Sequence, residues 1–225
     1  MLDKRLQCVA SMVRDGARLA DIGTDHAYLP VELMRQGRIA SAIAADIGEG
    51  PAASARQHIQ EAGLTERMEV RVCDGLQGIS SDEVTDVVIA GMGGETIVYI
   101  LEQAPWCRQE RYRLILQPMT KASELRSWLD TNGFAIEEEH VIRDGRHVYT
   151  AMAARFCDKP PSQDPLFPYV GALTPSEDSR PYLEQQLTYL SNKLGGLRCG
   201  GREEEAAALE ALMKRLNAFI NGGTV

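Results

Sequence analysis

The sequence predicts an α/β protein whose mostly parallel seven-stranded sheet ends in an antiparallel strand and is followed by an antiparallel helical hairpin. Three observations support this prediction. Short apolar runs alternate with helix-like stretches as far as residue 133, which is typical of βαβ units. An Asp-Gly pair, Asp144-Gly145, then lies between two extended runs and favours a β-hairpin. Beyond residue 180, leucines recur at helical spacing in two separate stretches.

The expected elements follow one another along the chain. We expect helices over residues 2–14, 27–37, 48–63, 95–104 and 122–133, and strands over 17–23, 40–46, 68–75, 84–94 and 112–118. Gly37 and Gly63 mark helix ends, and Pro51 falls in a first helical turn, where proline is tolerated. The continuous apolar runs "VVIA" and "LIL" suit strands that are buried on both faces of a sheet. The last two strands, over 134–142 and 147–156, should be antiparallel.

The composition changes after Phe156. The segment "CDKPPSQDPLFP" contains four prolines and is typical of a linker. Beyond it, two stripes at helical spacing flank the glycine-rich segment "GGLRCGG", which we expect to be the turn of a coiled-coil-like hairpin. The stripes are Leu183, Leu187, Leu190 and Leu194, and Leu209, Leu212, Leu216 and Phe219. The sequence therefore predicts two domains, residues 1–157 and residues 158–225.

Composition limits the function classes. The chain has 225 residues, 44% of them hydrophobic, and a net charge of −8. Because nucleic-acid binding depends on Lys and Arg, any such surface must be a local patch. No run is apolar and long enough for a signal peptide or a membrane span. The five cysteines are far apart and form no CxxC motif, so we expect reduced thiols, no metal site and a cytoplasmic location.

Glycines and acids fall at the ends of successive predicted strands. Gly23 ends the first strand, and Asp46 follows 23 residues later at the end of the second, where such folds place an acid that binds ribose hydroxyls. Parallel strands end at one edge of a sheet, where open α/β sheets bind ligands, so a nucleotide-like cofactor is predicted. Taken singly, Asp46 fits a helix cap, and the GMGG stretch fits close packing of a helix on the sheet. The candidate cofactor-binding residues are Asp21, Gly23, Thr24, Asp46, Asp74, Gly75, Gly91, Met92 and Gly93.

Several strings together resemble one family. These are "KRL..VA..V", "LADIGTDHAYLP", "EGP...A", "DGL", "IAGMGGE" and "LILQP", and the match runs from about residue 2 to 156. The chain resembles the bacterial tRNA (adenine-22-N1)-methyltransferases. The resemblance implies a Rossmann-like class I methyltransferase fold, S-adenosyl-L-methionine as cofactor, tRNA as partner, and methyl transfer to N1 of an adenine. The sequence departs from the family pattern at Asp3, Asp46 and Met119, where Ser, Glu and Asn are more usual.

The reaction suggests roles for the remaining residues of the motifs. Asp25 is the candidate that stabilises positive charge on the methylated base or accepts a proton, although it also suits a cap of the next helix. His26 is a candidate that contacts RNA or orients Asp25, and Tyr28 is a candidate that stacks on the flipped base; packing is the alternative for both. The candidate substrate-binding residues are Lys4 and Arg5, toward phosphates, and Gln117 and Pro118, toward the adenine edge.

Other functions remain open at this stage. A methyltransferase for a small molecule fits the acidic charge. A non-catalytic Rossmann-like binding module that associates through its hairpin fits the fold, although the intact Asp25, Asp46 and GMGG motif weaken that alternative. A dehydrogenase is the least favoured because of the Asp-Gly hairpin. The sequence leaves the oligomeric state unresolved and slightly favours a monomer.

Overall fold

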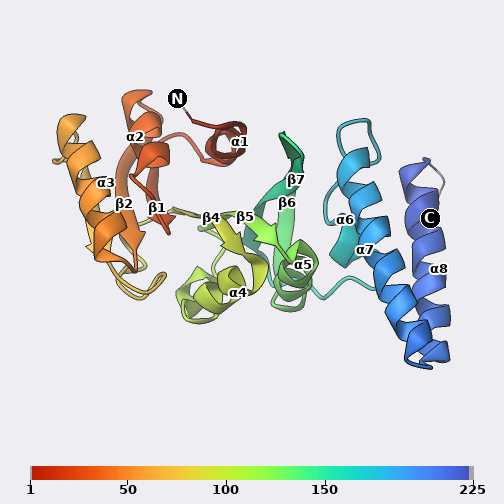
Figure 1. Cartoon of the computed structure of the whole chain (residues 1–225). Helices are drawn as coiled ribbons and strands as arrows, with labels where there is room; N and C mark the ends of the chain where they lie inside the picture. The colour runs from red at the N-terminus through yellow and green to blue at the C-terminus, as the bar shows by residue number, and fades with distance from the viewer. Residues whose placement is uncertain (1, 223–225) are drawn as a thin grey trace.

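A seven-stranded sheet forms the centre of the first part of the chain in the computed structural model, which describes residues 2–222 (Figure 1). Its strands are β1 (Ala17–Ile22), β2 (Ile39–Asp46), β3 (Met68–Val72), β4 (Asp86–Gly93), β5 (Arg113–Thr120), β6 (Phe134–Asp144) and β7 (His147–Phe156). They lie in the order β3-β2-β1-β4-β5-β7-β6. Strand β7 is antiparallel to both of its neighbours, and the other pairs are parallel. The predicted fold class is confirmed.

Helices cover both faces of this sheet. Helices α1 (Lys4–Met12), α2 (Tyr28–Arg35) and α3 (Glu49–Glu61) pack on one face, and α4 (Gly94–Glu102), the short helix η1 (Pro105–Cys107) and α5 (Ala122–Thr131) pack on the other. Successive residues of β4 point to opposite faces, so Val88 belongs to the first core and Val87 to the second. Burial on both faces explains why the central strands have continuous apolar runs.

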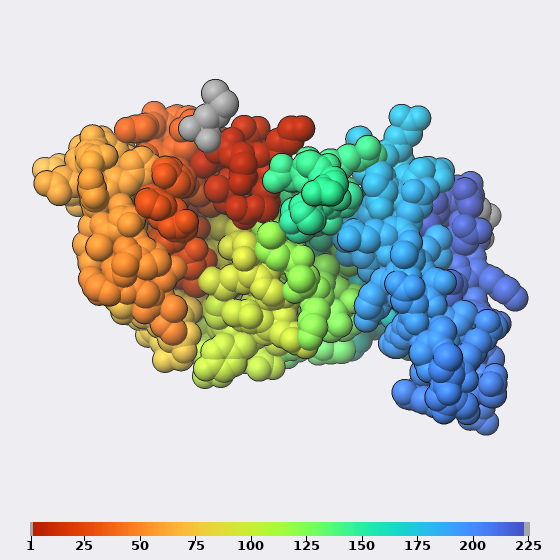
Figure 2. Space-filling model, viewed as in Figure 1, coloured from red at the N-terminus to blue at the C-terminus, as the bar shows by residue number. Residues whose placement is uncertain are grey.

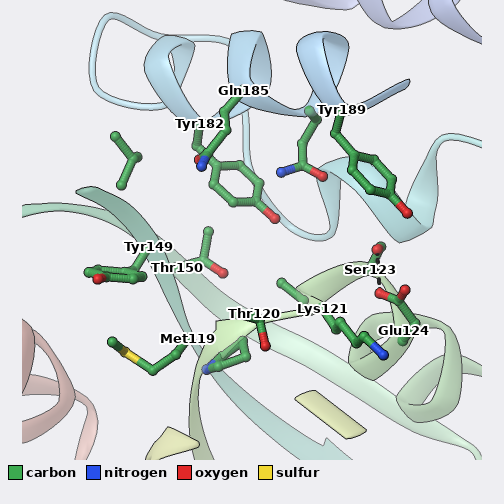
Figure 3. A pocket seen from close by; sticks show the side chains of 14 residues that line it. Met119, Thr120, Lys121, Ser123, Glu124, Tyr149, Thr150, Tyr182, Gln185 and Tyr189 are labelled. Carbon is green, nitrogen blue, oxygen red and sulfur yellow. Dashed lines mark hydrogen bonds between the residues drawn. The ribbon is translucent and has the colours of Figure 1, made fainter. Parts of the chain in front are cut away.

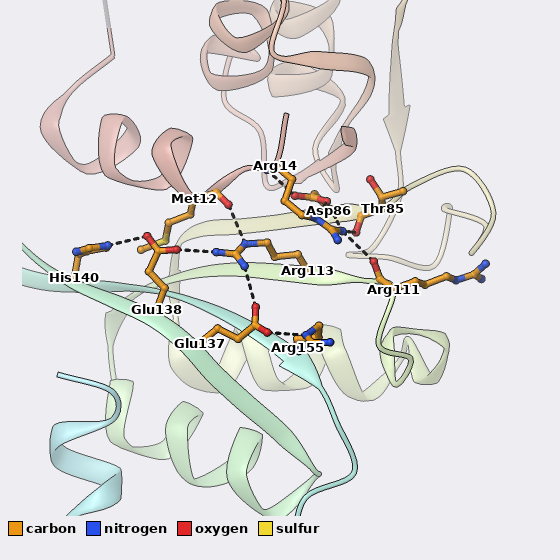
Figure 4. A network of polar contacts seen from close by, with 10 residues as sticks. All are labelled: Met12, Arg14, Thr85, Asp86, Arg111, Arg113, Glu137, Glu138, His140 and Arg155. Atoms are coloured by element: carbon orange, nitrogen blue, oxygen red, sulfur yellow. Dashed lines mark hydrogen bonds and ion pairs between the residues drawn. The ribbon is translucent and has the colours of Figure 1, made fainter. Parts of the chain in front are cut away.

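A polar network fixes the end of α1 against the sheet (Figure 4). The carboxylate of Asp86 is fully buried, and its Oδ1 accepts from Nε of Arg14 at 2.9 Å and from Nη2 at 2.7 Å. Arg113 donates to the carbonyl oxygen of Met12 at 3.0 Å and to Glu138 at 2.7 Å. The guanidinium of Arg14 is thus bound to a buried carboxylate. The network holds α1 across the sheet, with its first turn at the carboxyl edge.

The C-terminal part forms the predicted helical hairpin. After α6 (Phe167–Val170), helices α7 (Arg180–Cys199) and α8 (Glu203–Ile220) pack side by side at the end of the sheet that carries β6 (Figures 1 and 2). The glycine-rich segment differs from the prediction. Residues 195–199 continue α7, and the turn is confined to residues 200–202. Burial of Leu194 and Leu197 against the partner helix offsets the low helix propensity of the two glycines between them.

The proline-rich segment is more than a linker. Leu166 and Val170 are buried in a third core with the leucines of α7 and α8. Val141 of β6 and Val148 of β7 pack against the same core, so the hairpin rests on the last two strands. The segment expected to connect two domains therefore also helps to join them.

A buried ion pair lies where the hairpin meets the sheet. Arg126 of α5 and Glu139 of β6 have fully buried side chains, and Nη2 of Arg126 lies 2.7 Å from Oε1 of Glu139. Arg126 also donates to the hydroxyl of Tyr182 in α7, at 2.9 Å, and to the carbonyl oxygen of Pro168, at 3.0 Å. Glu139 accepts from the backbone N–H of Ala172 at 3.0 Å. The pair thus bonds both to the sheet and to the helical part.

Candidate active site

A cavity of about 380 Å³ opens at the carboxyl edge of β1 and β4, under the first turn of α1. It brings together residues from α1, from the β1–α2 turn and from the end of β4. These residues are Asp3, Arg5, Leu6, Asp21, Gly23, Thr24, Asp25, Tyr28, Leu29, Ala90 and Gly91. Six of the residues that the sequence assigns to catalysis or cofactor binding therefore share this cavity with Arg5.

The β1–α2 turn is tied to the neighbouring strand by its own amides. The N–H groups of Gly23 and Thr24 both donate to the carbonyl oxygen of Ala45, at 2.8 and 3.1 Å. These two amides are therefore unavailable to a phosphate, unlike those of a glycine-rich phosphate loop. A turn used this way needs only one glycine. Its other positions are free to carry functional side chains, which explains the string "TDHAY".

A buried carboxylate lies at the base of the turn. Asp21 is 7% exposed, and its Oδ2 accepts from the hydroxyl of Thr24 at 2.6 Å. Burial raises the pKa of Asp21 to about 6, and the hydrogen bond from Thr24 opposes this shift. The cavity thus contains a carboxylate whose negative charge would be stabilised by a cationic ligand group.

Gly23 and Met92 meet across the sheet edge. Gly23 has φ +73°, in the left-handed region, and a Cβ atom there would come within 2.1 Å of the terminal methyl of Met92. The left-handed backbone conformation favours glycine here, whereas the terminal methyl of Met92 belongs to a flexible side chain that can move aside. Gly91, with φ +81°, turns the chain at the end of β4, and Gly93 is the N-cap of α4. The GMGG stretch thus combines site geometry with packing.

Asp25 extends into solvent instead of capping a helix. Its side chain is 79% exposed and lies 3.3 Å from Nε2 of His26. Helix α2 begins at Tyr28, its N-cap is Ala27, and it has no side-chain cap. The capping alternative for Asp25 is therefore contradicted by the structure. The exposed carboxylate faces the cavity opening, and the neighbouring imidazole is its contact.

The turn at His26 is held in a strained conformation. His26 and Ala27 have φ of +61° and +54°, which costs about 1–3 kcal/mol for each residue of this kind. The ring of Tyr28 stacks on that of His26 at 5.2 Å, and His58 of α3 packs edge-on against Tyr28 at 5.1 Å. Nδ1 of His58 lies 2.7 Å from the carbonyl oxygen of His26. Since a carbonyl only accepts, Nδ1 of His58 carries the proton.

His58 is a site residue that sequence reasoning missed. It lies inside an ordinary amphipathic helix, ten residues after Gly48. Its role depends on how α3 packs against the β1–α2 turn. The sequence offered no signal for it beyond a polar residue within a helix.

Asp46, Asp74 and Gly75 lie at the ends of β2 and β3, beyond the lining of the 380 Å³ cavity. Oδ1 of Asp46 accepts from the N–H of Gly48 at 2.7 Å, and the Asp46 carbonyl accepts from Cys73 at 3.0 Å. Helix α3 has Gly48 as its N-cap, so Asp46 is not the helix cap considered from the sequence. Gly75 is buried against Ile100, where a Cβ atom would lie 2.9 Å from two side-chain carbons. Its glycine is therefore needed for packing.

Gln117 joins the two sides of the site. The side chain is fully buried, and its Oε1 accepts from the N–H of Gly91 and from Nη1 of Arg5, each at 3.1 Å. Its amide nitrogen donates to the carbonyl oxygen of Pro118 at 2.9 Å. Gln117 thus positions Arg5 and Gly91 from within the protein. A direct contact of Gln117 with an adenine edge stays a prediction, and it would require these bonds to open.

The other predicted substrate residues are divided among different surfaces. Arg5 lines the cavity and also contacts Asp3 at 3.5 Å. Lys4 is exposed on α1. Pro118 lines a different cleft, between β5 and α7. Asp3, noted from the sequence only as a departure from a family pattern, is the N-cap of α1 and accepts from the N–H of Leu6 at 2.7 Å.

Two general properties of the described residues bear on the site. Across residues 2–222, the helices are too short or too polar for any of them to span a bilayer. Within the same range, His, Cys, Asp and Glu side chains do not gather in groups of three or more that could hold a metal ion.

Comparison with known proteins places this geometry in context. Residues 2–152 match the family model described as a methyltransferase domain. A relative from Bacillus subtilis, tRNA (adenine(22)-N(1))-methyltransferase, is 37% identical over 172 residues, which are 76% of this chain and 72% of the relative. A crystal structure of the B. subtilis m1A22 tRNA methyltransferase TrmK superposes with a TM-score of 0.86 at 31% identity, over 98% of this chain and 99% of that one. A Streptococcus pneumoniae protein crystallised with S-adenosyl-L-methionine gives a TM-score of 0.82 at 33% identity, over 98% and 100%.

Proposed function

The chain belongs to the tRNA (adenine(22)-N(1))-methyltransferase family, and from this we propose that it transfers a methyl group from S-adenosylmethionine to N1 of adenine 22 in tRNA. The observation that carries the proposal is the cavity that joins the β1–α2 turn, Gly91 and Arg5 at the carboxyl edge of the sheet. It contains an exposed carboxylate, an exposed tyrosine and a buried carboxylate within one concave surface. This set of groups suits both a cationic cofactor and an unstacked base.

The residues present fit S-adenosylmethionine, which supplies an electrophilic methyl group on a sulfonium. That cofactor has no phosphate, which agrees with a turn whose amides at Gly23 and Thr24 are already bonded. Asp21 would hold the cationic amino group of the cofactor, because a buried carboxylate gains most from an opposite charge. Asp46, at the end of β2, would accept from ribose hydroxyls. Gly91 and Met92 would border the cofactor from the β4 side.

Adenine N1 carries a lone pair at neutral pH, so the protein has to position the base more than activate it. Placing a base in the cavity requires it to leave its stack, which costs a few kcal/mol. Tyr28 is half-exposed at the cavity rim and offers a ring for the unstacked base. Methylation makes the ring cationic or releases a proton from N6. Asp25 would stabilise that charge or accept the proton at its carboxylate.

His26 and His58 would position Asp25 and Tyr28 without touching the substrate themselves. His26 contacts Asp25 through Nε2 and carries Tyr28 on its ring, so it sets the direction of both groups. The N–H of His58 holds the carbonyl of His26 and supports the strained turn. Both are positioning residues in this proposal.

We assign residues 1–157 to the methyltransferase domain and residues 158–225 to an appendage that contacts tRNA. The charge of −8 argues against a broad phosphate-binding face, so contacts outside the cavity should be few and local. Lys4 and Arg5 on α1 would be such contacts at the cavity mouth. A tRNA substrate is also the reason to propose a cytoplasmic location.

The test is transfer of a labelled methyl group from S-adenosylmethionine into unmodified tRNA, followed by nucleoside analysis. We expect 1-methyladenosine, and we expect it to be lost from a tRNA in which adenine 22 is replaced. Cofactor binding without transfer to tRNA would reject the tRNA substrate. It would favour the small-molecule methyltransferase that the acidic charge allows.

A further inference from the structure

A second cleft, of about 310 Å³, lies between the end of β5, strand β7 and helix α7 (Figure 3). The end of β5 supplies Met119 and Thr120, and Lys121 follows them. Helix α7 supplies Gln185 and Tyr189, which face these residues across the cleft. Its volume is at the lower end of the roughly 300–1,000 Å³ of small-ligand sites. We call it the β5–α7 cleft.

The β5–α7 cleft adjoins the active-site cavity through the end of β5. Gln117 bonds to Arg5 and Gly91, which line the active-site cavity. The next residue, Pro118, lines the β5–α7 cleft. One short backbone segment therefore separates the two hollows. For a polynucleotide strand with one base in the active-site cavity, the β5–α7 cleft is therefore a neighbouring hollow.

The walls of the cleft suit a nucleobase. Tyr189 is half-exposed, and Tyr149 lies on the opposite side with one face stacked on His147 at 5.9 Å, so each tyrosine has at most one face toward a base in the cleft. Gln185 projects from α7 into the cleft, and its amide can both donate and accept. Thr120 adds a hydroxyl at the opposite wall. Aromatic faces combined with a few amide and hydroxyl groups are typical of proteins that bind unpaired bases.

The charge of the cleft argues for a base and against a phosphate. Among the described residues that line it, only Lys121 and Glu124 carry a formal charge, and the two have opposite signs. Lys121 is also ion-paired with Glu95 of α4. Binding of a phosphate depends on uncompensated positive charge, which this surface lacks. A base can be bound by stacking without it.

The cleft is held in shape by the buried pair at the junction of sheet and hairpin. Tyr182, at the inner end of the cleft, is 4% exposed, and its hydroxyl accepts from Arg126 at 2.9 Å. This bond links α7 to α5, and Arg126 also donates to the hydroxyl of Thr150 in β7 at 3.4 Å, so one guanidinium connects the helix that carries Tyr189 with the strand that carries Tyr149. A preformed site of this kind loses less side-chain entropy when a ligand binds.

We propose that the β5–α7 cleft is a second nucleotide subsite, which binds an unpaired base of the RNA substrate that neighbours the methylated adenine. This inference rests on the proposed function, because it takes the RNA to be the substrate of the adjoining cavity. It gives the helical hairpin a defined task. Helix α7 supplies one wall of the subsite, and the neutral cleft selects an unstacked base in place of a stretch of duplex backbone.

The test compares Tyr189→Ala and Gln185→Ala with Tyr99→Ala in the full chain. Tyr99 lies on α4 and is 48% exposed, close to the 50% of Tyr189, and it is absent from the cleft lining, so it is a matched control. Binding of unmodified tRNA and of a short labelled single-stranded oligoadenylate is measured by fluorescence anisotropy. Steady-state methyl transfer and cofactor binding are measured in parallel. Because Tyr189 and Gln185 are exposed, loss of folding is not expected.

Loss of one stacked base corresponds to roughly 5- to 150-fold in affinity. We therefore expect Tyr189→Ala to raise the Kd for both RNAs and the KM for tRNA at least 5-fold, with kcat and cofactor affinity unchanged, and Tyr99→Ala to change none of them. Unaltered RNA affinity in Tyr189→Ala and Gln185→Ala, in an enzyme that still methylates tRNA, overturns the subsite alone. A protein that methylates no tRNA but loses oligoadenylate affinity on Tyr189→Ala keeps the subsite and rejects the proposed reaction. A wild-type chain that binds neither RNA rejects both.

Discussion

Asp21 couples the active site to pH. Burial raises the pKa of this carboxyl to about 6 from its usual 3.8, so the folded chain binds more protons than the unfolded chain between these values. Stability contributed by the neutral carboxyl is fully present below about pH 4 and is lost as the pH rises toward 6. We expect Asp21→Asn to abolish this decline, which amounts to about 3 kcal/mol. Urea unfolding of both proteins between pH 4 and 7 measures it, and parallel profiles would contradict the assignment.

Asp25 is the residue on which the proposed chemistry depends most. We expect Asp25→Asn to reduce kcat by about 10²- to 10⁴-fold, the range of general acid–base contributions, while cofactor affinity and stability stay unchanged. Asp15→Asn is the matched control, because the Asp15 side chain is 82% exposed, against 79% for Asp25, and is ion-paired with Arg38. Single-turnover transfer and calorimetric cofactor binding make the comparison. A kcat for Asp25→Asn equal to that of the control variant would remove Asp25 from the mechanism.

For single residues, the sequence predicted which ones lie at the strand ends better than it predicted which side chains bond to one another. The strand ends gave Gly23, Asp46 and Gly91 because glycine and acid signals are local in the chain. The role of Gln117 could not be found in this way, since its bonds to Arg5 and Gly91 depend on residues 112 and 26 positions away. A buried amide with every group bonded looks the same in a sequence as one that faces a ligand.

The close approach of helix α4 to the β5–α5 turn depends on the absence of a side chain at Gly94. A Cβ atom at Gly94 would lie 2.3 Å from the carbonyl oxygen of Lys121 and 3.1 Å from that of Thr120, so backbone would have to move. Overpacking of this kind costs about 1–3 kcal/mol. For a chain of this size we therefore expect Gly94→Ala to lower Tm by roughly 2–12 °C.

Gly50→Ala is the control for this substitution. Gly50 lies in the first turn of α3, and a Cβ atom there has no neighbour within 4 Å. Its Tm should be equal to or above that of the wild type, because alanine favours helix. Differential scanning calorimetry of the two variants decides the matter. Equal Tm values for both would show that α4 and the turn are not packed as closely as the structure indicates.

The elements themselves were largely predictable because their signals are local. The strands of the parallel sheet and the Asp-Gly hairpin follow from apolar periodicity and turn chemistry, and β7 is antiparallel as expected. The errors occur where tertiary packing competes with local preference. Gly195 and Gly196 are helical because Leu194 and Leu197 are buried, and Leu166 belongs to a core although prolines flank its segment. Whether these segments are helical or buried depends on residues of other helices against which the leucines pack.

On the scale of the whole molecule, the junction between sheet and hairpin determines how the two parts act together. Arg126 and Glu139 bond to each other and, between them, to Tyr182, Pro168 and Ala172 of the C-terminal part. Deletion of residues 158–225 would remove these partners and uncover the pair. Loss of tRNA binding after such a deletion would then mix two effects, the missing contacts and a disturbed α5 and β6. Point substitutions at the junction separate them.

The pair itself supports the last prediction. Arg126→Met leaves the Glu139 carboxylate buried without its counter-ion, and we expect a loss of about 3–5 kcal/mol in the free energy of unfolding. The double variant Arg126→Met with Glu139→Leu should recover much of this loss, because both charges are then removed from the interior. Denaturant unfolding of the single and double variants gives their coupling energy.

The same variants report on the orientation of the hairpin. In Arg126→Met, Tyr182 loses its hydrogen bond from Arg126, and the polar link between α7 and α5 is removed, so the KM for tRNA should rise. Cofactor affinity should stay the same, since neither Arg126 nor Glu139 lines the active-site cavity. If the double variant regains stability but keeps the raised KM, the polar junction sets the position of α7 as well as supporting the fold. If KM remains at the wild-type value in both variants, packing of the leucine core alone positions the hairpin, and the ion pair contributes only to stability.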